Sequence, residues 1–356
     1  MSAVLLNGHG GYERLEYRND VPVPQIRAGE VLVQVNAAGL NNTDINMRVG
    51  WYSKSVHGDT ATVSADTGSP ATQSDDGGWA GGAPIFPLIQ GADVCGHIVA
   101  TGPGVAPTRV GERVIVDPVL RPTIQDTDAQ CAYLGSDCNG AFAEFVRVPS
   151  INAFAIASNS TASDLASFPC SYSAAENMLT RAGVRQGETV LVTGASGGVG
   201  SAAVQLAVRR GAIVLAVAGM SKLDKVAQLG ASGVLPRDSD IRACLGTNSV
   251  DVVIDVVGGS QFGSLLEVLR REGRYAVAGA IAGPIVALDL RTLYLKDQRL
   301  LGCTIPDRPV FANLIGYIER GEIRPIVART YQLSAIVEAQ REFLCKQHVG
   351  KIVLLP

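Results

Sequence analysis

A glycine-rich turn within residues 191–200 (LVTGASGGVG) carries the clearest chemical signal in the sequence. It joins an apolar stretch of strand length, 189–193, to a segment of helical period, 198–210, and its spacing is that of a dinucleotide fingerprint with alanine in the first slot. Gly197 would let the backbone approach a pyrophosphate, Gly200 would let the helix pack close to the strand, and the helix N-terminus would offer N–H groups to the anion. The turn residues expected to meet a nicotinamide dinucleotide are Ala195, Ser196, Gly197, Gly198, Val199 and Gly200.

The end of the next strand indicates which dinucleotide would bind. An NAD-preferring unit places Asp or Glu about 20 residues after the fingerprint, where the carboxylate holds the ribose 2′-hydroxyl. Here the expected strand 213–218 ends in Ala218-Gly219, and Ser221 and Lys222 follow as a hydroxyl donor and a counter-charge for a 2′-phosphate. The sequence therefore favours NADPH over NADH. The alternative is that Ser221 caps a helix and Lys222 is a solvated surface charge.

The elements that must position this turn alternate from about residue 188 onward. Apolar runs of strand length separate segments of helical period, which predicts a doubly wound parallel sheet with helices on both faces. Strands are expected at 189–193, 213–218, 250–257 and 275–279, and helices at 198–210, 222–229 and 261–271. The tail after residue 305 returns to mixed character, with helices at 309–320 and 334–346 and strands at 326–331 and 351–355.

The first half of the chain shows short β-rich runs, such as the alternating residues 30–38, and predicts a smaller β-rich domain. The segment 51–84 interrupts it with Gly, Ser, Thr and Asp and almost no aliphatic residue, so it cannot build a core. A loop of this length inside a compact domain is either functional or disordered. A lid over the site and plain disorder both stay open as interpretations.

The overall composition excludes several classes of function. The length of 356 residues suggests about two domains, and 30 Lys+Arg against 33 Asp+Glu leaves no basic surplus for nucleic acid. No apolar stretch reaches the ~20 residues of a membrane span, and the first residues lack a secretory signal pattern. The 7 cysteines are scattered with no C-x2-C pair, and the 4 histidines form no H-x3-H pair. We expect a small-molecule substrate and a reducing, cytoplasmic setting.

Taken as a whole, the chain resembles the medium-chain dehydrogenase/reductases, and within them the zinc-free quinone reductase and enoyl reductase branch. The segments that carry the resemblance are GLNNTDINMRVGWY, QGADVCGHIVATGPGV, VGERV, YLGSDCNGAFAEF, CSYSAAENMLTRAGVRQGETVLVTGASGGVG and GKIVL. The resemblance implies an α/β fold with a GroES-like catalytic domain at 1–152 and 305–356, an inserted Rossmann domain at 153–304, and a homodimer. The loop 51–84 is longer than the one the quinone reductases carry.

The resemblance also addresses the metal. Zinc-dependent relatives take the catalytic ion on two cysteines and a histidine, and this sequence has Asn41, Ala92 and Cys170 at those positions, with Asp93 in place of the neighbouring Glu. One thiolate and one carboxylate do not make a tetrahedral zinc site. The structural-zinc lobe needs four closely spaced cysteines, whereas residues 117–138 hold only Cys131 and Cys138. We therefore expect no metal.

Without a metal, an alkoxide has no strong stabiliser, whereas a conjugated C=C bond or a quinone can accept hydride at carbon while charge spreads onto a remote oxygen. In the quinone reductases that this chain resembles, the positions of Asn41, Asp44 and Tyr52 line the nicotinamide and substrate site, and we take these three as catalytic candidates. A tyrosine that those enzymes carry two residues after Asp44 is Asn46 here.

Three further positions follow from the same resemblance. Ser173 stands where relatives place a hydroxyl against the nicotinamide, and Gly279 stands where their backbone meets that half of the cofactor. Lys351 is a second candidate for phosphate charge, with a plain solvent-facing lysine as the alternative.

These residues together predict a zinc-independent, NADPH-dependent reductase of enones, enoyl thioesters or quinones. One alternative keeps the fold and cofactor but makes the protein an NADP-dependent alcohol dehydrogenase or carbonyl reductase. Another is a protein that binds NADPH without turnover.

Overall fold

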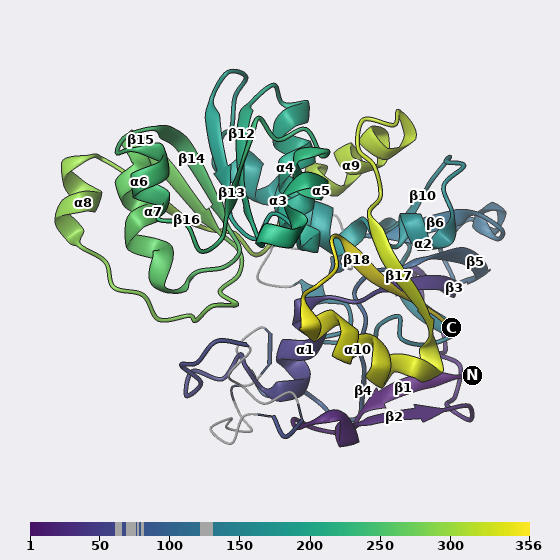
Figure 1. Cartoon of the computed structure of the whole chain (residues 1–356). Coiled ribbons are helices and arrows are strands. Elements are labelled where there is room, and N and C mark those ends of the chain that lie inside the picture. The colour runs from purple at the N-terminus through teal and green to yellow at the C-terminus, as the bar shows by residue number, and fades with distance from the viewer. Residues whose placement is uncertain (61–65, 69–75, 77, 80–81, 122–130) are drawn as a thin grey trace.

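A computed structural model describes the whole chain except residues 61–65, 69–75, 77, 80–81 and 122–130, and it has two regions of different architecture (Figure 1). One contains the parallel sheet, and the other is rich in antiparallel strands. The predicted α/β fold, with a parallel, Rossmann-like sheet and a separate β-rich part, is confirmed.

Six of the described strands form the sheet that carries the glycine-rich turn, in the order β13-β12-β11-β14-β15-β16, with parallel pairing throughout. They are β11 (Thr189–Val192), β12 (Ile213–Ala218), β13 (Gly233–Pro236), β14 (Val250–Asp255), β15 (Leu269–Val277) and β16 (Arg299–Gly302). The helices around them are α3 (Pro169–Arg181), α4 (Gly198–Arg209), α5 (Leu223–Ala227), α6 (Ile241–Leu245), α7 (Phe262–Val268) and α8 (Leu290–Leu295).

The apolar runs of these strands are continuous because both faces of the sheet are covered. Val190 and Val192 of β11 pack in one core with α3 and α4, whereas Leu191 packs in another with α6 and α7. Buried parallel strands have this pattern, which is why they could be located from the sequence.

One predicted boundary is wrong. The helix expected at 261–271 ends at Val268, and β15 begins at Leu269. Leu269 is fully buried and pairs with Val250 in the sheet, so its burial and ladder partner prevail over the helical period that continues into 270–271.

The second region is built on a sheet in the order β10-β6-β5-β3-β18-β17, with β9 also paired to β3. Its strands are β3 (Glu30–Gly39), β5 (Cys95–Thr101), β6 (Arg113–Val116), β9 (Phe145–Pro149), β10 (Ala153–Ala155), β17 (Val327–Gln332) and β18 (Lys351–Leu355). Smaller pieces are β1 (Ala3–Leu6), β2 (Leu15–Arg18), β4 (Leu88–Ile89), β7 (Val119–Leu120), β8 (Ala132–Tyr133), and the helices α1 (Asn42–Val49), α2 (Ala162–Leu165), α9 (Pro309–Glu319) and α10 (Ile336–Cys345).

The C-terminal strand returns to this region, where β18 pairs with β3 and Val353 lies opposite Gly39 (Figure 1). Three elements cross the expected domain limits of 152 and 305, among them α2, which lies after residue 152 but packs on β3 and β5. β10 begins at Ala153 but pairs with β6 of the antiparallel sheet, and α9 packs with α3 and α4 in the core of the parallel sheet. Among the described helices, none has the length and apolar character needed to cross a bilayer.

Candidate active site

The fingerprint turn leaves β11 at Val192 and enters α4 at Gly198. A Cβ atom on Gly200 would lie 2.2 Å from the carbonyl oxygen of Gly194, so only glycine allows this approach of helix to turn. A Cβ on Gly197 would meet only the Gly194 oxygen, at 3.5 Å, so the space beside it is open within the described chain. Gly197 is the N-cap of α4, and the first N–H groups of a helix lack acceptors inside it. The turn therefore offers room and donors for an anion.

Two more of the expected cofactor residues are Gly279, at this edge of the sheet, and Ser173, in α3. Gly279 follows β15, and a Cβ there would lie 2.9 Å from the carbonyl oxygen of Val256, just after β14. Ser173 is buried in α3, where its hydroxyl donates to the carbonyl oxygen of Cys170 at 3.2 Å.

Basic groups gather at the end of β12. Lys222 lies in a 3-10 turn, Met220–Lys222, together with the exposed Ser221, and its Nζ donates to the carbonyl oxygen of Lys346 at 2.8 Å. Lys346 ends α10, and its own Nζ donates to Oδ1 of Asn42 at 2.9 Å. Within the described residues neither ammonium has a carboxylate partner. Two half-buried ammonium groups without acidic partners favour an anionic ligand.

Burial and neighbouring positive charges lower the pKa values of Lys346 and Lys222. Burial, and then the positive charge of Lys222, lower the pKa of Lys346 to about 7. Burial, and then the charge of Arg237, lower the pKa of Lys222. Arg237 follows β13 and donates its backbone N–H to the carbonyl oxygen of Ala218, so a third cationic residue lies at this edge. A dianion placed here would relieve the repulsion among these groups.

Lys351 points into the protein rather than into solvent. It is 3 % exposed, and a Cβ on Gly198 would lie 3.1 Å from its Cδ, so its stem passes along the fingerprint turn. Its ammonium donates to Oδ2 of Asp93 at 2.6 Å and to Oδ1 of Asn41 at 2.5 Å. The solvent-facing alternative for Lys351 is therefore wrong, and the ammonium lies among the catalytic candidates.

Asn41 is hydrogen-bonded to both Asp44 and Asp93. The Asn41 side-chain amide donates to Oδ2 of Asp93 at 2.9 Å, and its backbone N–H donates to Oδ2 of Asp44 at 2.7 Å at the start of α1. Burial raises the pKa of the Asp44 carboxyl to about 7, against the lowering effect of the Asn41 N–H and the Lys351 charge. These contacts give Asn41 and Asp44 positions in a buried hydrogen-bond network.

Two tyrosines, Tyr52 and Tyr133, interact with residues of this part of the site. Burial raises the pKa of Tyr52 to about 12, while hydrogen bonds with Thr43 and Asn46 act in the opposite direction. Tyr133 donates its hydroxyl to Sγ of Cys170 at 3.0 Å. Burial, and then the negative charge of Asp93, raise the pKa of the Cys170 thiol to about 12, so this cysteine is a neutral thiol.

The residues at two of the metal positions of zinc-dependent relatives, Asn41 and Cys170, come together around Asp93. The backbone N–H of Cys170 donates to Oδ1 of Asp93 at 2.5 Å, while Asn41 holds the other oxygen. At these positions the chain has the amide of Asn41, the methyl group of Ala92 and the thiol of Cys170, and the Lys351 ammonium lies 2.5 Å from the Asn41 oxygen. Within the described part of the chain no group of three His, Cys, Asp or Glu side chains could hold a metal ion.

Described parts of the loop 51–84 contact both regions. The backbone N–H of Thr60 donates to the carbonyl oxygen of Ile281 at 3.1 Å, beyond β15. Trp79 stacks on Tyr133 with ring centroids 4.5 Å apart. The remaining loop residues, 61–65, 69–75, 77 and 80–81, lie outside the described residues.

Sequence reasoning missed Lys346, Tyr133 and Trp79 as members of the site. No spacing rule marks them, because each reaches the site through a long-range contact, and 124 residues separate Lys346 from Lys222. Tyr133 lies in a segment that carried the family resemblance, but without a role.

Two family descriptions match the chain, an alcohol dehydrogenase GroES-like domain over residues 27–158 and a zinc-binding dehydrogenase over residues 198–320. An acryloyl-coenzyme A reductase of Metallosphaera sedula is 29% identical over 365 residues, covering 99% of this chain and 99% of that protein. The quinone oxidoreductase of Rattus norvegicus is 26% identical over 369 residues, covering 100% of this chain and 98% of that protein. A crystal structure from Sinorhizobium meliloti 1021, described provisionally as an alcohol dehydrogenase, is 46% identical with a TM-score of 0.90, covering 100% of this chain and 96% of that one.

Proposed function

The chain belongs to the medium-chain dehydrogenase/reductase superfamily, and from that premise we propose that it is an NADPH-dependent reductase of activated C=C bonds or quinones that uses no catalytic metal. Its relatives make it an oxidoreductase with a nicotinamide cofactor. The observation that carries the metal-free proposal is the donor set of Asn41, Ala92 and Cys170 around the Lys351 ammonium.

Bound NADPH would supply hydride from its dihydronicotinamide ring. The open space beside Gly197 and the N-terminus of α4 would hold the pyrophosphate, and Gly279 and Ser173 would border the nicotinamide. Asn41 and Asp44 act as positioning residues, since their recorded hydrogen bonds tie the network together. The Tyr52 hydroxyl is the candidate donor toward the substrate oxygen.

The acceptor follows from what these donors can stabilise. Hydride addition to an enone, enoyl thioester or quinone leaves an enolate or phenolate-like oxygen. The conjugate acid of this oxygen has a pKa of about 10, near that of a phenol or a lysine ammonium. An alkoxide is far more basic and calls for a Lewis acid. Acryloyl-coenzyme A reductase and quinone oxidoreductase are the names of two of its relatives, and both reactions fit this scheme.

A panel assay tests the proposal. NADPH oxidation is followed by absorbance with enones, enoyl-CoA thioesters, quinones, aldehydes and ketones. Turnover confined to aldehydes and ketones would favour the alternative of a carbonyl reductase or alcohol dehydrogenase, which the description of the S. meliloti structure supports. An absence of turnover with every acceptor would favour a protein that binds NADPH without reacting.

The preference for NADPH rests on Lys222, Lys346 and Ser221 as the 2′-phosphate site, and it predicts a pH dependence. The pKa of Lys346 is lowered to about 7 in the free protein, so Lys346 is charged below pH 7 and loses its proton as the pH rises. The 2′-phosphate dianion of NADPH binds the charged form of Lys346 more tightly than the neutral form. NADPH affinity is therefore highest near neutral pH and falls as the pH rises through about 7 and 8. At lower pH, protonation of the 2′-phosphate, whose pKa is about 6, weakens NADPH binding. Titration calorimetry with NADPH and with NADH checks this, because NADH affinity stays flat over the same range.

We include the lid in the proposal, since Trp79 covers Tyr133 next to Cys170. Trp79→Ala removes an aromatic stack and exposes the Tyr133 face, a loss of about 1–1.5 kcal/mol, so the substrate KM rises about tenfold. The KM for NADPH stays within about twofold, because Trp79 stacks on Tyr133 and not on a residue of the fingerprint turn. Steady-state kinetics measure both values. Ile85→Ala, at an exposed side chain just beyond the loop, is the control, and equal effects of the two variants on the substrate KM would refute the lid.

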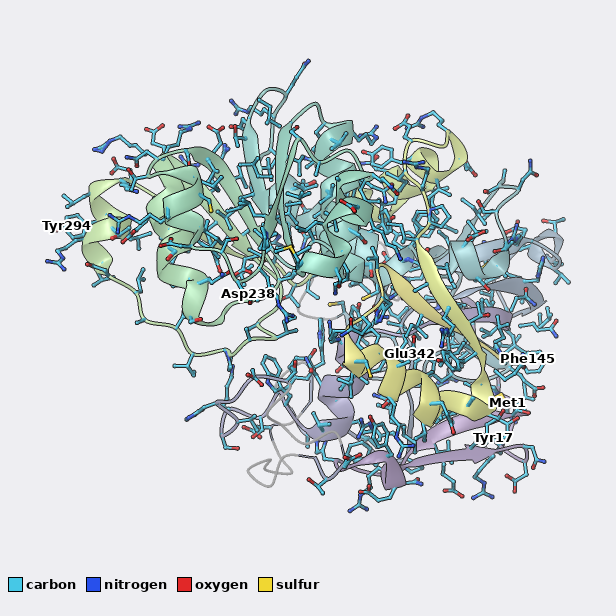
Figure 2. All side chains as sticks on the ribbon, viewed as in Figure 1. Met1, Tyr17, Phe145, Asp238, Tyr294 and Glu342 are labelled. Atoms are coloured by element: carbon cyan, nitrogen blue, oxygen red, sulfur yellow. The ribbon has the colours of Figure 1, made fainter. Side chains whose placement is uncertain are left out.

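A cytoplasmic homodimer completes the proposal. No disulfide joins the described cysteines, which suits a reducing compartment. β16 is an edge strand, and nearby α8 carries exposed apolar side chains, Leu290, Tyr294 and Leu295, of which Tyr294 projects outward in Figure 2. A second copy pairing along this edge would cover them. Light scattering should give the dimer mass for the wild type and the monomer mass for a Leu290→Glu/Leu295→Glu variant. A monomeric wild type would refute the proposed homodimer.

A further inference from the structure

The Lys351 ammonium is a buried cation with a fixed position. Lys351 is 3 % exposed, Asp93 is fully buried, and Asn41 is 7 % exposed. The residue before it, Gly350, donates its backbone N–H to the carbonyl oxygen of Ser196 at 3.0 Å, so the start of β18 is attached to the fingerprint turn. The cation therefore lies where the cofactor turn and the catalytic candidates meet.

The ammonium has bonding capacity left. It carries three N–H donors, and within the described residues two have acceptors, Oδ2 of Asp93 and Oδ1 of Asn41. The position of Asn41 is that of the first zinc ligand in zinc-dependent relatives, and the ammonium is 2.5 Å from its Oδ1. Asp93 also holds the backbone of Cys170, at the position of another ligand. The Lys351 ammonium, a monovalent cation, therefore lies beside the position that the zinc ion takes in zinc-dependent relatives.

A small apolar cluster lies beside these polar groups. Asp93 and Asn41 are drawn to each other and to Lys351, while Cys170 joins Ala92, Val119 and Tyr133 in a small apolar cluster against which Trp79 packs. An oxygen of a flat, conjugated molecule placed against that cluster would be able to accept the third N–H of the Lys351 ammonium. Charge stabilisation is strongest in such a dry, fixed setting.

We propose that Lys351 is a catalytic residue of the reductase proposed above, and that its ammonium takes the role of the metal by donating a hydrogen bond to the oxygen on which negative charge develops. Hydride forms a C–H bond at the β-carbon or ring carbon, the π electron pair moves toward the oxygen, and the Lys351 N–H stabilises the resulting oxyanion without giving up its proton. Water supplies the proton that completes the reduction. This inference rests on the proposed function for its reaction, but the charge at Lys351 can be tested separately.

The first experiment separates catalysis from folding. Lys351→Met alone leaves a buried, unpaired Asp93 carboxylate and should lower Tm. The double variant Lys351→Met/Asp93→Asn replaces the ion pair with neutral groups of similar shape and should restore Tm. Its kcat with the acceptor found in the panel should remain about 100- to 1,000-fold below wild type, as for loss of an oxyanion donor, while the KM for NADPH changes by less than about threefold. A double variant with wild-type kcat would overturn the proposal and make the pair structural.

The second experiment needs no turnover. 4-Nitrophenol is added as an oxyanion mimic in the presence of NADP⁺, and its absorbance reports the ionised fraction of the bound dye. The wild type should bind the phenolate preferentially, lowering the apparent pKa of the dye, and the double variant should not. A wild type that fails to favour the phenolate overturns the proposal. Lys351-dependent phenolate binding in a protein that oxidises no NADPH would support the cation site while refuting the proposed function.

Discussion

We expect NADPH to bind about 100-fold more weakly to a Lys222→Ala/Lys346→Gln variant than to the wild type, while NADH affinity changes by less than about threefold. Hydrogen bonds to a charged group contribute about 1.5–3 kcal/mol each, and 1.4 kcal/mol is a factor of ten. The two lysines would share one phosphate, so their effects should fall short of additivity. Isothermal titration with both cofactors measures the ratio.

The choice of glutamine at 346 keeps a donor for Asn42, which accepts from the wild-type lysine at 2.9 Å, and so limits any disturbance of α10. Lys225→Ala, at an exposed lysine of the neighbouring helix α5, removes the same charge without reaching the end of β12. If Lys225→Ala lost as much NADPH affinity as the double variant, the effect of the two lysines on NADPH binding would be that of general surface charge alone. Unchanged NADPH affinity in the double variant would remove the 2′-phosphate site from this edge.

The second large effect concerns two glycines three residues apart. Gly200→Ala places a Cβ 2.2 Å from the carbonyl oxygen of Gly194 and 2.8 Å from Cα of Ala195, both of them backbone atoms that can yield only if α4 moves. We expect a loss of at least ~2 kcal/mol in the free energy of unfolding, together with loss of cofactor binding. Thermal unfolding followed by circular dichroism measures the first, and NADPH titration the second.

Gly197→Ala is the matched control for the fold. Its Cβ would enter open space, 3.5 Å from the nearest atom, at a backbone conformation of φ −78° that alanine adopts freely. Tm should therefore stay near the wild-type value, while NADPH affinity falls at least tenfold because the methyl group occupies the approach of the pyrophosphate. A Gly197→Ala variant that binds NADPH normally would contradict the placement of the cofactor at this turn.

The parallel sheet and its turn could be predicted because their signals are local. Buried strands on both sides of the sheet read as continuous apolar runs, and the expected strand 213–218 coincides with β12. The same local reasoning failed where a tertiary contact prevailed, as at Leu269, whose pairing with Val250 ends α7 early.

The site was harder to predict because its members meet across the chain. Nothing in the sequence GKIVL distinguishes a buried Lys351 from a surface lysine, since its burial depends on Asp93, 258 residues away, and Asn41, 310 residues away. Likewise, Trp79 sits in a segment with almost no aliphatic residue, and its stacking on Tyr133 is a property of the folded chain alone.

The central claim is hydride transfer to carbon of an activated double bond without a metal, and isotope placement tests it most directly. Chelator-treated protein is incubated with NADPH deuterated at the transferable C4 position and an α,β-unsaturated ketone or thioester, and the product is examined by NMR. Deuterium is expected at the β-carbon, at the rate of the untreated protein. Deuterium at the carbonyl carbon, or activity that disappears on chelation and returns with zinc, would contradict it.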